Sequence, residues 1–241
     1  MKRVVHLGPS ESKGGMATVI ANMVKNSPEG WSAEAIPTHS DNSILSIFRW
    51  INASKKLSSE FRKGAYDLVH IHVTHSLSWW RKLSFMKKCE KFRVPMIIHI
   101  HSGKFDTFCS GFAGRSIERE LSKGDRKIVV LEERWLEKLK HWIPIDSEVV
   151  RNFSSPVSRS NNHVPSQKLR LLVLSRESSV KRHDFAVQVA KCIGKMDREV
   201  TLSITGGPRL ENEIYENLEV KKYGWVTMEE RKSLLAESDF L

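Results

Sequence analysis

Two cations that could hold a diphosphate follow a short apolar run in the C-terminal third of the sequence. The run is Leu169–Leu174, which is too short for a helix and predicts a buried parallel strand. Arg176 and Lys181 come next, five positions apart in a polar turn, and apolar residues at helical spacing begin at Phe185. A strand, a cationic turn and a helix N-terminus together favour the binding of phosphate groups. A solvated basic loop that binds nothing is the alternative.

A second candidate site follows the first predicted strand, Arg3–Leu7. The loop after it contains the pair Gly14 and Gly15 and leads into a helix that we expect to start near Met16. Glycines allow close approach to the backbone, and free N–H groups at a helix N-terminus attract anions. The loop matches neither GxGxxG nor GxxxxGK[ST], which argues against a dinucleotide site or a P-loop. A tight turn without a ligand is the alternative.

Histidines form a third group of candidate functional residues. Two of them, His70 and His72, alternate along one predicted strand, and His99 and His101 alternate along the next. The two strands are Leu68–Val73 and Pro95–His101. Residues i and i+2 share a face of a strand, so a metal cluster is one interpretation, although no carboxylate or cysteine lies at zinc spacing nearby. Ligands bind at the carboxyl ends of open parallel sheets, which favours His101 as a substrate contact and leaves His99 to the core. Core histidines with satisfied hydrogen bonds are the third interpretation.

Strand-like and helix-like segments alternate along the chain, which is typical of an α/β protein with parallel sheets. Further strands are expected at Trp31–Ile36, Lys127–Leu131, Glu148–Val150, Val200–Thr205 and from Asp239 onward. Helices are expected at Ser43–Lys63, Leu77–Phe92, Arg115–Leu121, Glu132–Trp142, Glu211–Leu218 and Met228–Glu237. The segment Phe105–Phe112 is predicted to be an aromatic loop that covers an acceptor. The turn-rich segment 153–167 has no periodicity and predicts a linker between domains at 1–152 and 168–241.

Two of the predicted helices combine apolar and basic residues. In Ser43–Lys63 one helical stripe is apolar, and we expect it to pack against the sheet. The stripe consists of Ile44, Ile47, Phe48 and Ile51. In Leu77–Phe92, tryptophans stand among many lysines and arginines, and packing against the sheet with a solvated basic face is again expected. Binding to an acidic membrane surface is the alternative for both helices.

The composition narrows the class of protein. Of the 241 residues 40% are hydrophobic and 28% are charged, as in ordinary globular proteins. No apolar run approaches the roughly 18 residues that span a bilayer, and the N-terminal apolar stretch is too short for a secretory signal. Three cysteines without metal spacing favour a cytoplasmic location, which includes attachment to the inner membrane face. The net charge of +11 predicts an anionic partner, and the missing RNA-binding and helix-turn-helix signatures argue against nucleic acid.

These motifs resemble those of glycosyltransferase family 4. Members of that family retain the anomeric configuration of the transferred sugar. They have the GT-B fold, in which two Rossmann-like domains are separated by a cleft. The resemblance implies that Arg176 and Lys181 hold the phosphates of a UDP- or GDP-linked sugar donor. Gly14 and Gly15 would face donor and acceptor, and His101 would contact the reacting sugar.

The resemblance also adds Asn152, Gly206 and Gly207 to the donor-binding residues. Asn152 is the one match to the family's Pro-Asn-Gly turn, and the glycine pair follows the strand Val200–Thr205. The chain departs from the family at Ser175 and Arg182, where glycine is usual.

The implied function is transfer of a hexose to a glycan, polysaccharide or lipid-linked acceptor, with retention. Two side-chain cations would do the work of a metal, so no metal or other cofactor is expected. In the family a further strand leads to two glutamates eight positions apart, and this sequence stops at Leu241 before them. We therefore expect an incomplete, marginally stable second domain. A partner protein could complete it, or the chain could be a binding or regulatory subunit without activity.

Overall fold

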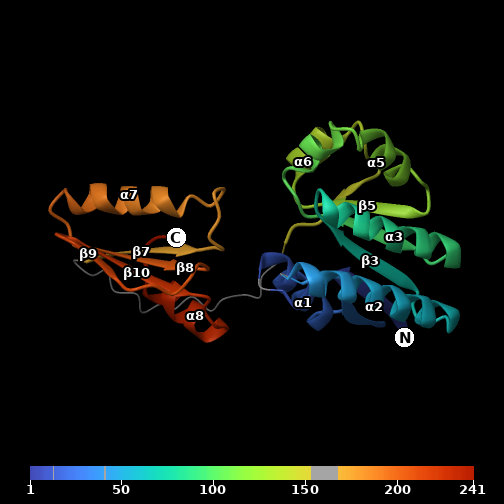
Figure 1. The fold of residues 1–241 in the computed structure, drawn as a ribbon, viewed down its shortest axis with the longest axis horizontal. Coiled ribbons are helices and arrows are strands. Elements are labelled where there is room, and N and C mark those ends of the chain that lie inside the picture. Colours follow the sequence, from blue (N-terminus) through green and yellow to red (C-terminus); the bar gives the residue numbers. More distant parts are fainter. Residues whose placement is uncertain (13, 41, 153–167) are drawn as a thin grey trace. The chain divides into compact units, whose positions relative to one another are not determined.

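The structure, a computed structural model, describes residues 1–12, 14–40, 42–152 and 168–241. It divides into two compact units, Met1–Ser155 and Pro156–Leu241, each with its own sheet (Figure 1). Both units are α/β, as the alternation of strand-like and helix-like segments predicts. The predicted linker, 153–167, lies outside the described residues.

A parallel sheet forms the centre of the first unit, with strand order β2-β1-β3-β4-β5-β6. The strands are β1 (Lys2–Gly8), β2 (Trp31–Pro37), β3 (Leu68–Val73), β4 (Met96–Ile100), β5 (Arg126–Val130) and β6 (Glu148–Val149). The chain adds β2 on one side of β1 and all later strands on the other side. The carboxyl ends of β1 and β3 therefore flank a topological switch point, which is where open α/β sheets bind ligands.

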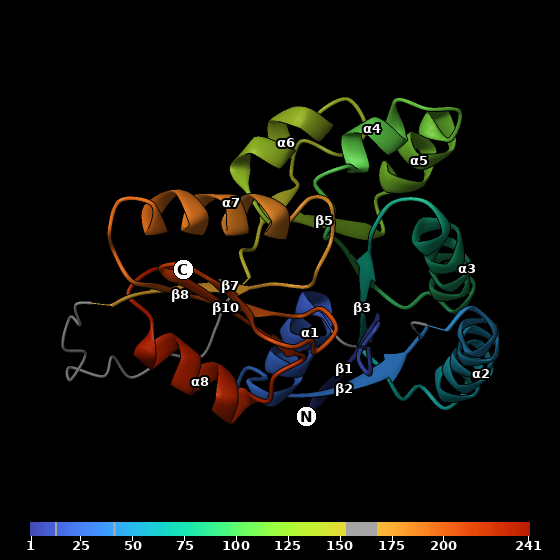
Figure 2. The same ribbon diagram turned by 60° about the vertical axis from the view of Figure 1, so that its left-hand side comes forward.

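The two faces of this sheet are covered differently. The helices are α1 (Gly15–Lys25), α2 (Ser43–Arg62), α3 (Leu77–Phe92), α4 (Phe105–Cys109), α5 (Gly114–Leu121) and α6 (Glu133–Leu139). Aliphatic residues such as Val69 and Ile71 face the main core, where Leu57 of α2 and Trp79 of α3 are fully buried. Helix α1 lies on the opposite side of the sheet from α2 and α3 (Figure 2). The histidines of β3 and β4 alternate with the core residues and so point to the side of α1.

The second unit contains a four-stranded sheet with the order β7-β8-β10-β9. Its elements are β7 (Leu169–Leu174), α7 (His183–Gly194), β8 (Val200–Thr205), β9 (Glu213–Tyr215), β10 (Leu218–Gly224) and α8 (Met228–Glu237). Strands β7, β8 and β10 are parallel, and β9 pairs antiparallel with β10. Helices α7 and α8 lie on opposite faces of the sheet (Figure 1). Phe240 forms a parallel bridge with Leu171 beside β7, where the sequence predicts another strand.

The helix predicted over Glu211–Leu218 is wrong, because this segment forms β9 and the start of β10. The register pairs Leu218 with Tyr215 and leaves two residues between the strands. One of these, Asn217, accepts the Val200 N–H at 2.8 Å and donates its side-chain amide to Gly194 at 3.1 Å. Packing of β10 against β8 overrides the local helical pattern.

The prediction for the apolar stripe of α2 is also wrong. Ile44 is 68% exposed and Phe48 is 60% exposed, and Ile47 and Ile51 are exposed as well. The helix instead turns Ser46, Trp50, Ala53 and Leu57 inward. Ser46 can be buried because its hydroxyl donates to Ser40 O at 2.7 Å, and the Trp50 indole donates to Ser84 Oγ at 2.9 Å. The side chains of Ser46 and Trp50, whose polar groups are hydrogen-bonded, therefore face the core in place of the apolar stripe.

The aromatic loop predicted at Phe105–Phe112 is partly a helix, α4. The Phe105 ring is fully buried, with its centroid 5.7 Å from that of Trp79, so this side chain belongs to the core and does not cover an acceptor. Phe112 is exposed.

Candidate functional site

Three turns meet at the carboxyl end of the second sheet, and Gly206 connects them through its backbone. The turns follow β7, β8 and β10. The Glu177 N–H donates to Gly206 O at 3.0 Å, and the Gly206 N–H donates to Gly224 O at 2.6 Å. These two hydrogen bonds fix the positions of the residues that leave the three parallel strands.

Only glycine fits at the centre of this arrangement. Gly206 has φ +81°, and a Cβ there would clash with the carbonyl oxygen of Ser175 and lie 2.8 Å from the Cα of Arg176. At Gly207 a Cβ would lie 2.5 Å from Glu177 Oε2, which is the end of a flexible side chain. The predicted donor residues Gly206 and Gly207 therefore lie directly against the turn that carries Arg176.

The two predicted phosphate ligands are exposed on the loop between β7 and α7. The guanidinium carbon of Arg176 lies 5.6 Å from the ring centroid of Trp225, in a cation–π contact that orients the charge. The Lys181 N–H donates to Ser178 O at 3.0 Å and closes the turn between the two cations. Trp225 directly follows β10, so it lies at the same end of the sheet.

Helix α7 starts with two contacts that the sequence does not predict. Arg182, the residue before the helix, has φ +48°, a left-handed conformation that glycine adopts more readily than other residues. Its guanidinium forms a fork with Asp184, with two N–O distances of 3.0 Å, and this hydrogen bond lowers the pKa of the Asp184 carboxyl. The buried His183 lies 2.9 Å from Ser175 Oγ, so it ties the start of α7 to the end of β7.

A cavity of about 240 Å³ lies beside these turns. Its lining comes from the loop after β7, the first turn of α7, the loop after β8 and the end of β10. Glu177, Asp184 and Lys222 supply charged groups, while Ile204 and Pro208 supply apolar surface. A mixed lining of this kind suits a ligand that carries both hydroxyl and charged groups.

The glycine pair of the first unit lies at the carboxyl end of β1, as expected. Gly14 is the N-cap of α1, with φ 148°, and its carbonyl accepts the Thr18 N–H at 3.3 Å. Gly15 is the first residue of the helix, and no atom lies within 4 Å of the position that its Cβ would occupy. The loop is held to α2 by an ion pair of 2.8 Å between Glu11 and Arg49. A side chain at position 15, in the first turn of α1, would therefore meet no neighbour within 4 Å.

His101 lies at the same edge of the first sheet, directly after β4. Its N–H donates to Val73 O at 2.8 Å, and its Nε2 lies 2.9 Å from His72 Nδ1. Burial lowers the pKa of His101 to about 3, so the ring is neutral at pH 7. Beside it His75 Nδ1 lies 2.7 Å from Ser102 Oγ. His101 can therefore offer one ring nitrogen to a ligand as a neutral donor or acceptor.

His101 is the last member of a group that we call the histidine ladder. The ladder consists of His6, His70, His72, His99 and His101. His6 Nδ1 lies 3.2 Å from His72 Nε2, and His70 Nε2 lies 3.2 Å from His99 Nδ1. Burial lowers the pKa of His6 and His99 to about 4 and those of His70 and His72 well below the ordinary value. The rings are therefore neutral near pH 7.

Lys82 is a buried residue that the sequence analysis counted on a solvated face, and that prediction is wrong. Its side chain is 1% exposed, and its amine donates to the hydroxyl of Thr38. Thr38 in turn donates its N–H to Gly8 O at 3.0 Å, beside the start of the glycine loop. Burial lowers the pKa of Lys82 well below its ordinary value. Its spacing from Trp79 and Met86 along α3 was the available signal, because all three lie on one helical face.

Asn152 is exposed and lies three residues beyond the end of β6. It is the last described residue before the gap at 153–167. Among the described helices, none combines the length and the apolarity that crossing a membrane requires.

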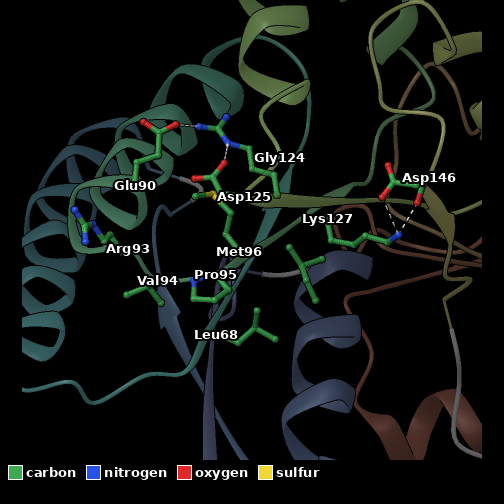
Figure 3. Close-up of a pocket in the computed structure, with 12 residues that line it drawn as sticks. Leu68, Glu90, Arg93, Val94, Pro95, Met96, Gly124, Asp125, Lys127 and Asp146 are labelled. Carbon is green, nitrogen blue, oxygen red and sulfur yellow. Dashed lines mark hydrogen bonds and ion pairs between the residues drawn. The ribbon is translucent and has the colours of Figure 1, made fainter.

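A cavity of about 570 Å³ lies at the amino ends of β3, β4 and β5, away from the edge that binds ligands in such sheets (Figure 3). Its floor is apolar and its rim is charged. Several of the lining charges form ion pairs: Arg126 with Glu90 of the lining and with Glu120 beside it, and Lys127 with Asp146 at 3.4 Å. This cavity borders an ion-pair network that joins the amino ends of the strands.

Comparison with known proteins gives matches among solved structures. No protein-family model and no curated protein sequence matches the chain. The crystal structure of Anabaena HepE in complex with UDP-glucose matches with a TM-score of 0.61 and 13% identity, over 99% of this chain and 72% of that one. The chain has the GT-B fold. The prediction of two Rossmann-like units is thereby confirmed.

Two further glycosyltransferases show the same likeness. SnogD from Streptomyces nogalater matches with a TM-score of 0.51 and 12% identity, over 93% of this chain and 73% of that one. The glycotransferase of kitacinnamycin matches with a TM-score of 0.50 and 10% identity, over 99% and 79%. Identities this low establish the fold and leave the chemistry to be argued from the site residues.

Proposed function

We propose that the protein is a retaining glycosyltransferase of the family 4 type, which moves a hexose from a nucleotide-sugar to an acceptor hydroxyl. The observation that carries the proposal is the junction of three turns at Gly206, which holds Arg176 at the carboxyl end of the second sheet. The GT-B fold supports the proposal as well, because a protein with this fold has been crystallised in complex with UDP-glucose. Residues 168–241 then form the donor-side domain, and residues 1–152 form the acceptor-side domain.

In the proposed reaction the bond between the anomeric carbon and the diphosphate oxygen breaks, and a bond to the acceptor oxygen forms. The nucleoside diphosphate leaves with the electron pair of the broken bond and so gains one negative charge, and the proton of the acceptor hydroxyl passes to the departing phosphate oxygen or to water. Arg176 and Lys181 stabilise that charge, most strongly in the oxocarbenium-like transition state. Gly206 holds the adjacent turn in place through its backbone hydrogen bonds, and the N–H of Gly207 on that turn contributes to donor binding. In this proposal the two side-chain cations fill the role that a metal ion has in other transferases.

The first unit supplies the acceptor-side groups in this proposal. The N-terminus of α1 at Gly14 and Gly15 offers N–H groups and open space to the ligand. His101 is neutral and has one ring nitrogen directed at His72, which leaves the other for a sugar or acceptor hydroxyl. Asn152 contributes to the nucleotide region.

Ligand-observed NMR with UDP- and GDP-sugars tests donor binding. We expect saturation-transfer signals from one nucleotide-sugar, and we expect Arg176→Ala to abolish them. Lys195→Ala is the matched control, because it removes one cation at the far end of α7. Equal binding by wild type and Arg176→Ala would refute the assignment of the phosphate site. Retention is tested separately by the anomeric configuration of the product in a transfer assay.

The alternative is a binding or regulatory subunit, completed by a partner protein or acting without turnover. Donor binding that Arg176→Ala removes, with no transfer to any acceptor, would favour this alternative. A copurifying protein that restores transfer would identify the partner.

We infer an acceptor of the glycan, polysaccharide or lipid-linked class, and the exposed α2 stripe favours the lipid-linked class. Ile44, Ile47, Phe48 and Ile51 form an apolar surface on the first half of α2. That half of the helix follows the carboxyl end of β2 and is tied to the glycine loop through Arg49 and Glu11. An acidic membrane surface would attract the net charge of +11 and accept the apolar side chains. In this proposal the protein is cytoplasmic and attaches peripherally to the inner membrane face.

A further inference from the structure

Most of the histidine ladder has no role in the proposed transfer. Three members, His6, His70 and His72, each place one ligand nitrogen within 4.8 Å of the others. His6 lies directly opposite His70 in the β1–β3 register, and His72 lies two residues further along β3 on the same face. The arrangement is therefore a consequence of the strand register and holds three imidazoles at one place on a rigid sheet.

The distance between the His6 and His72 nitrogens matches that between two ligands of one metal ion. Zn–N bonds of about 2.0–2.1 Å in a tetrahedral site place two ligand nitrogens about 3.3 Å apart. His6 Nδ1 and His72 Nε2 are already 3.2 Å apart. An ion bound by both rings would require only small side-chain movements.

The chemistry of the group restricts the ion. Among the described residues, both groups with converging ligand atoms consist of histidines alone. Neutral imidazole suits zinc, cobalt, nickel and copper, whereas magnesium and calcium require oxygen ligands. Three imidazoles also leave one tetrahedral position for water.

We propose that His6, His70 and His72 bind one divalent transition-metal ion of the zinc and cobalt class. A second group, His72, His99 and His101, shares His72 through its other nitrogen. The first group is the better site because its three residues all lie within strands, whereas His101 lies beyond the end of β4. The bound ion would join β1 to β3 at the two strands that flank the switch point.

Metal binding by the full chain tests the inference. The protein is treated with a chelator, dialysed, and titrated with CoCl₂ and separately with ZnCl₂ in a calorimeter. We expect one ion per chain and, for cobalt, the visible absorption of a four-coordinate site with nitrogen ligands. His6→Ala and His72→Ala should each weaken binding by at least about tenfold. His75→Ala is the matched control and should bind as wild type does.

A second measurement uses only wild-type protein, so its result does not depend on whether the variants fold. The imidazole ¹⁵N signals of His6, His70 and His72 should shift on addition of ZnCl₂, and that of His75 should not. No binding to wild type, with unchanged imidazole signals, would overturn the inference and leave the ladder as a chain of hydrogen-bonded rings. Binding lost in His101→Ala and kept in His6→Ala would also overturn it. Neither measurement needs activity, so both hold whether or not the protein transfers sugars.

Discussion

Replacing Gly206 with alanine should disable the donor site, because this glycine joins three turns. The residue has φ +81°, and its N–H and C=O bond to the turns after β10 and β7. A methyl group would clash with the carbonyl oxygen of Ser175 and crowd the Cα of Arg176. These neighbours are backbone atoms of a strand end, so they move only if the turn that carries Arg176 moves.

Two costs add up in this variant. A left-handed conformation costs an L-residue about 1–2 kcal/mol relative to glycine. Steric overpacking costs about 1–3 kcal/mol more. The sum is about 2–5 kcal/mol, against about 5–15 kcal/mol for the whole stability of a typical domain. We therefore expect Gly206→Ala to destabilise the second unit strongly and to displace Arg176.

The assay combines denaturant unfolding with donor binding. The indole N–H signal of Trp225 reports on the second unit, because Trp225 follows β10 directly. Gly194→Ala is the matched control within the same unit. Its Cβ would lie 3.6 Å from Asn217 O, an ordinary contact, and alanine favours the helix by about 0.5–1 kcal/mol. Gly207→Ala should fall between the two, because Glu177 can rotate away.

The expected order of stability is therefore Gly194→Ala above Gly207→Ala above Gly206→Ala. If Gly206→Ala unfolds at the same denaturant concentration as Gly194→Ala and binds the donor equally well, then the three turns do not depend on this residue. That result would refute the reasoning.

Three further results are expected. Burial lowers the pKa of Lys82 in the folded protein, whereas in the unfolded chain this pKa is about 10.4. Between these two pKa values the unfolded chain binds more protons than the folded protein does. The free energy of unfolding of the wild type therefore increases as the pH rises through this window. Lys82→Met should therefore be more stable near pH 7, by about 1–3 kcal/mol, and the difference should shrink toward pH 10 in urea unfolding. The double variant Ile47→Ser and Phe48→Ser should lose binding to phosphatidylglycerol vesicles in flotation without loss of stability, because both side chains are exposed. Iodoacetamide should label Cys192 in the native protein and leave Cys89 unmodified, because Cys89 is buried and burial raises its pKa to about 12.

Each of these predictions has a control and a contrary outcome. Lys87→Met changes an exposed lysine of the same helix and should not alter the pH dependence. A constant difference between Lys82→Met and wild type from pH 7 to pH 10 would contradict the burial argument. Asn52→Ser should keep vesicle binding, and equal flotation of the double variant would exclude the α2 stripe as the membrane surface. Labelling of Cys89 at the rate of Cys192 would show that α3 opens in the native state.

The parallel strands could be predicted from the sequence because each is a short apolar run between turn residues. Leu169–Leu174 and Val200–Thr205 have the bounds that their composition predicts. The hairpin of β9 and β10 could not be predicted in the same way. Its sequence has many charged residues at helical spacing, and the deciding contacts run from Asn217 to Gly194 and Val200, which are distant in the chain.

Residues of the candidate site could be predicted from the sequence only where the residue type and its position in a βα unit were enough to suggest a role. Arg176 and Gly206 follow strands and lie where such residues are expected. His183 was missed, because its role depends on a contact with Ser175 across the turn. The contact of Trp225 with Arg176 could not be predicted for the same reason, since the two side chains come from different turns. Lys82 was placed on the wrong face because lysine side chains are usually exposed. Its amine is buried here with the hydroxyl of Thr38 as hydrogen-bond acceptor and the Phe85 ring 5.7 Å away.

The hydrogen bonds at Gly206 have a consequence for how the second unit opens. Surface turns usually exchange their amide protons quickly, whereas these amides are bonded across three strand ends. The amide of Glu177 can exchange only when the turns after β7 and β8 part, and that of Gly206 only when the turns after β8 and β10 part. Their exchange rates therefore measure the free energy of a concerted opening of the loops, and a donor bound there would slow both amides together.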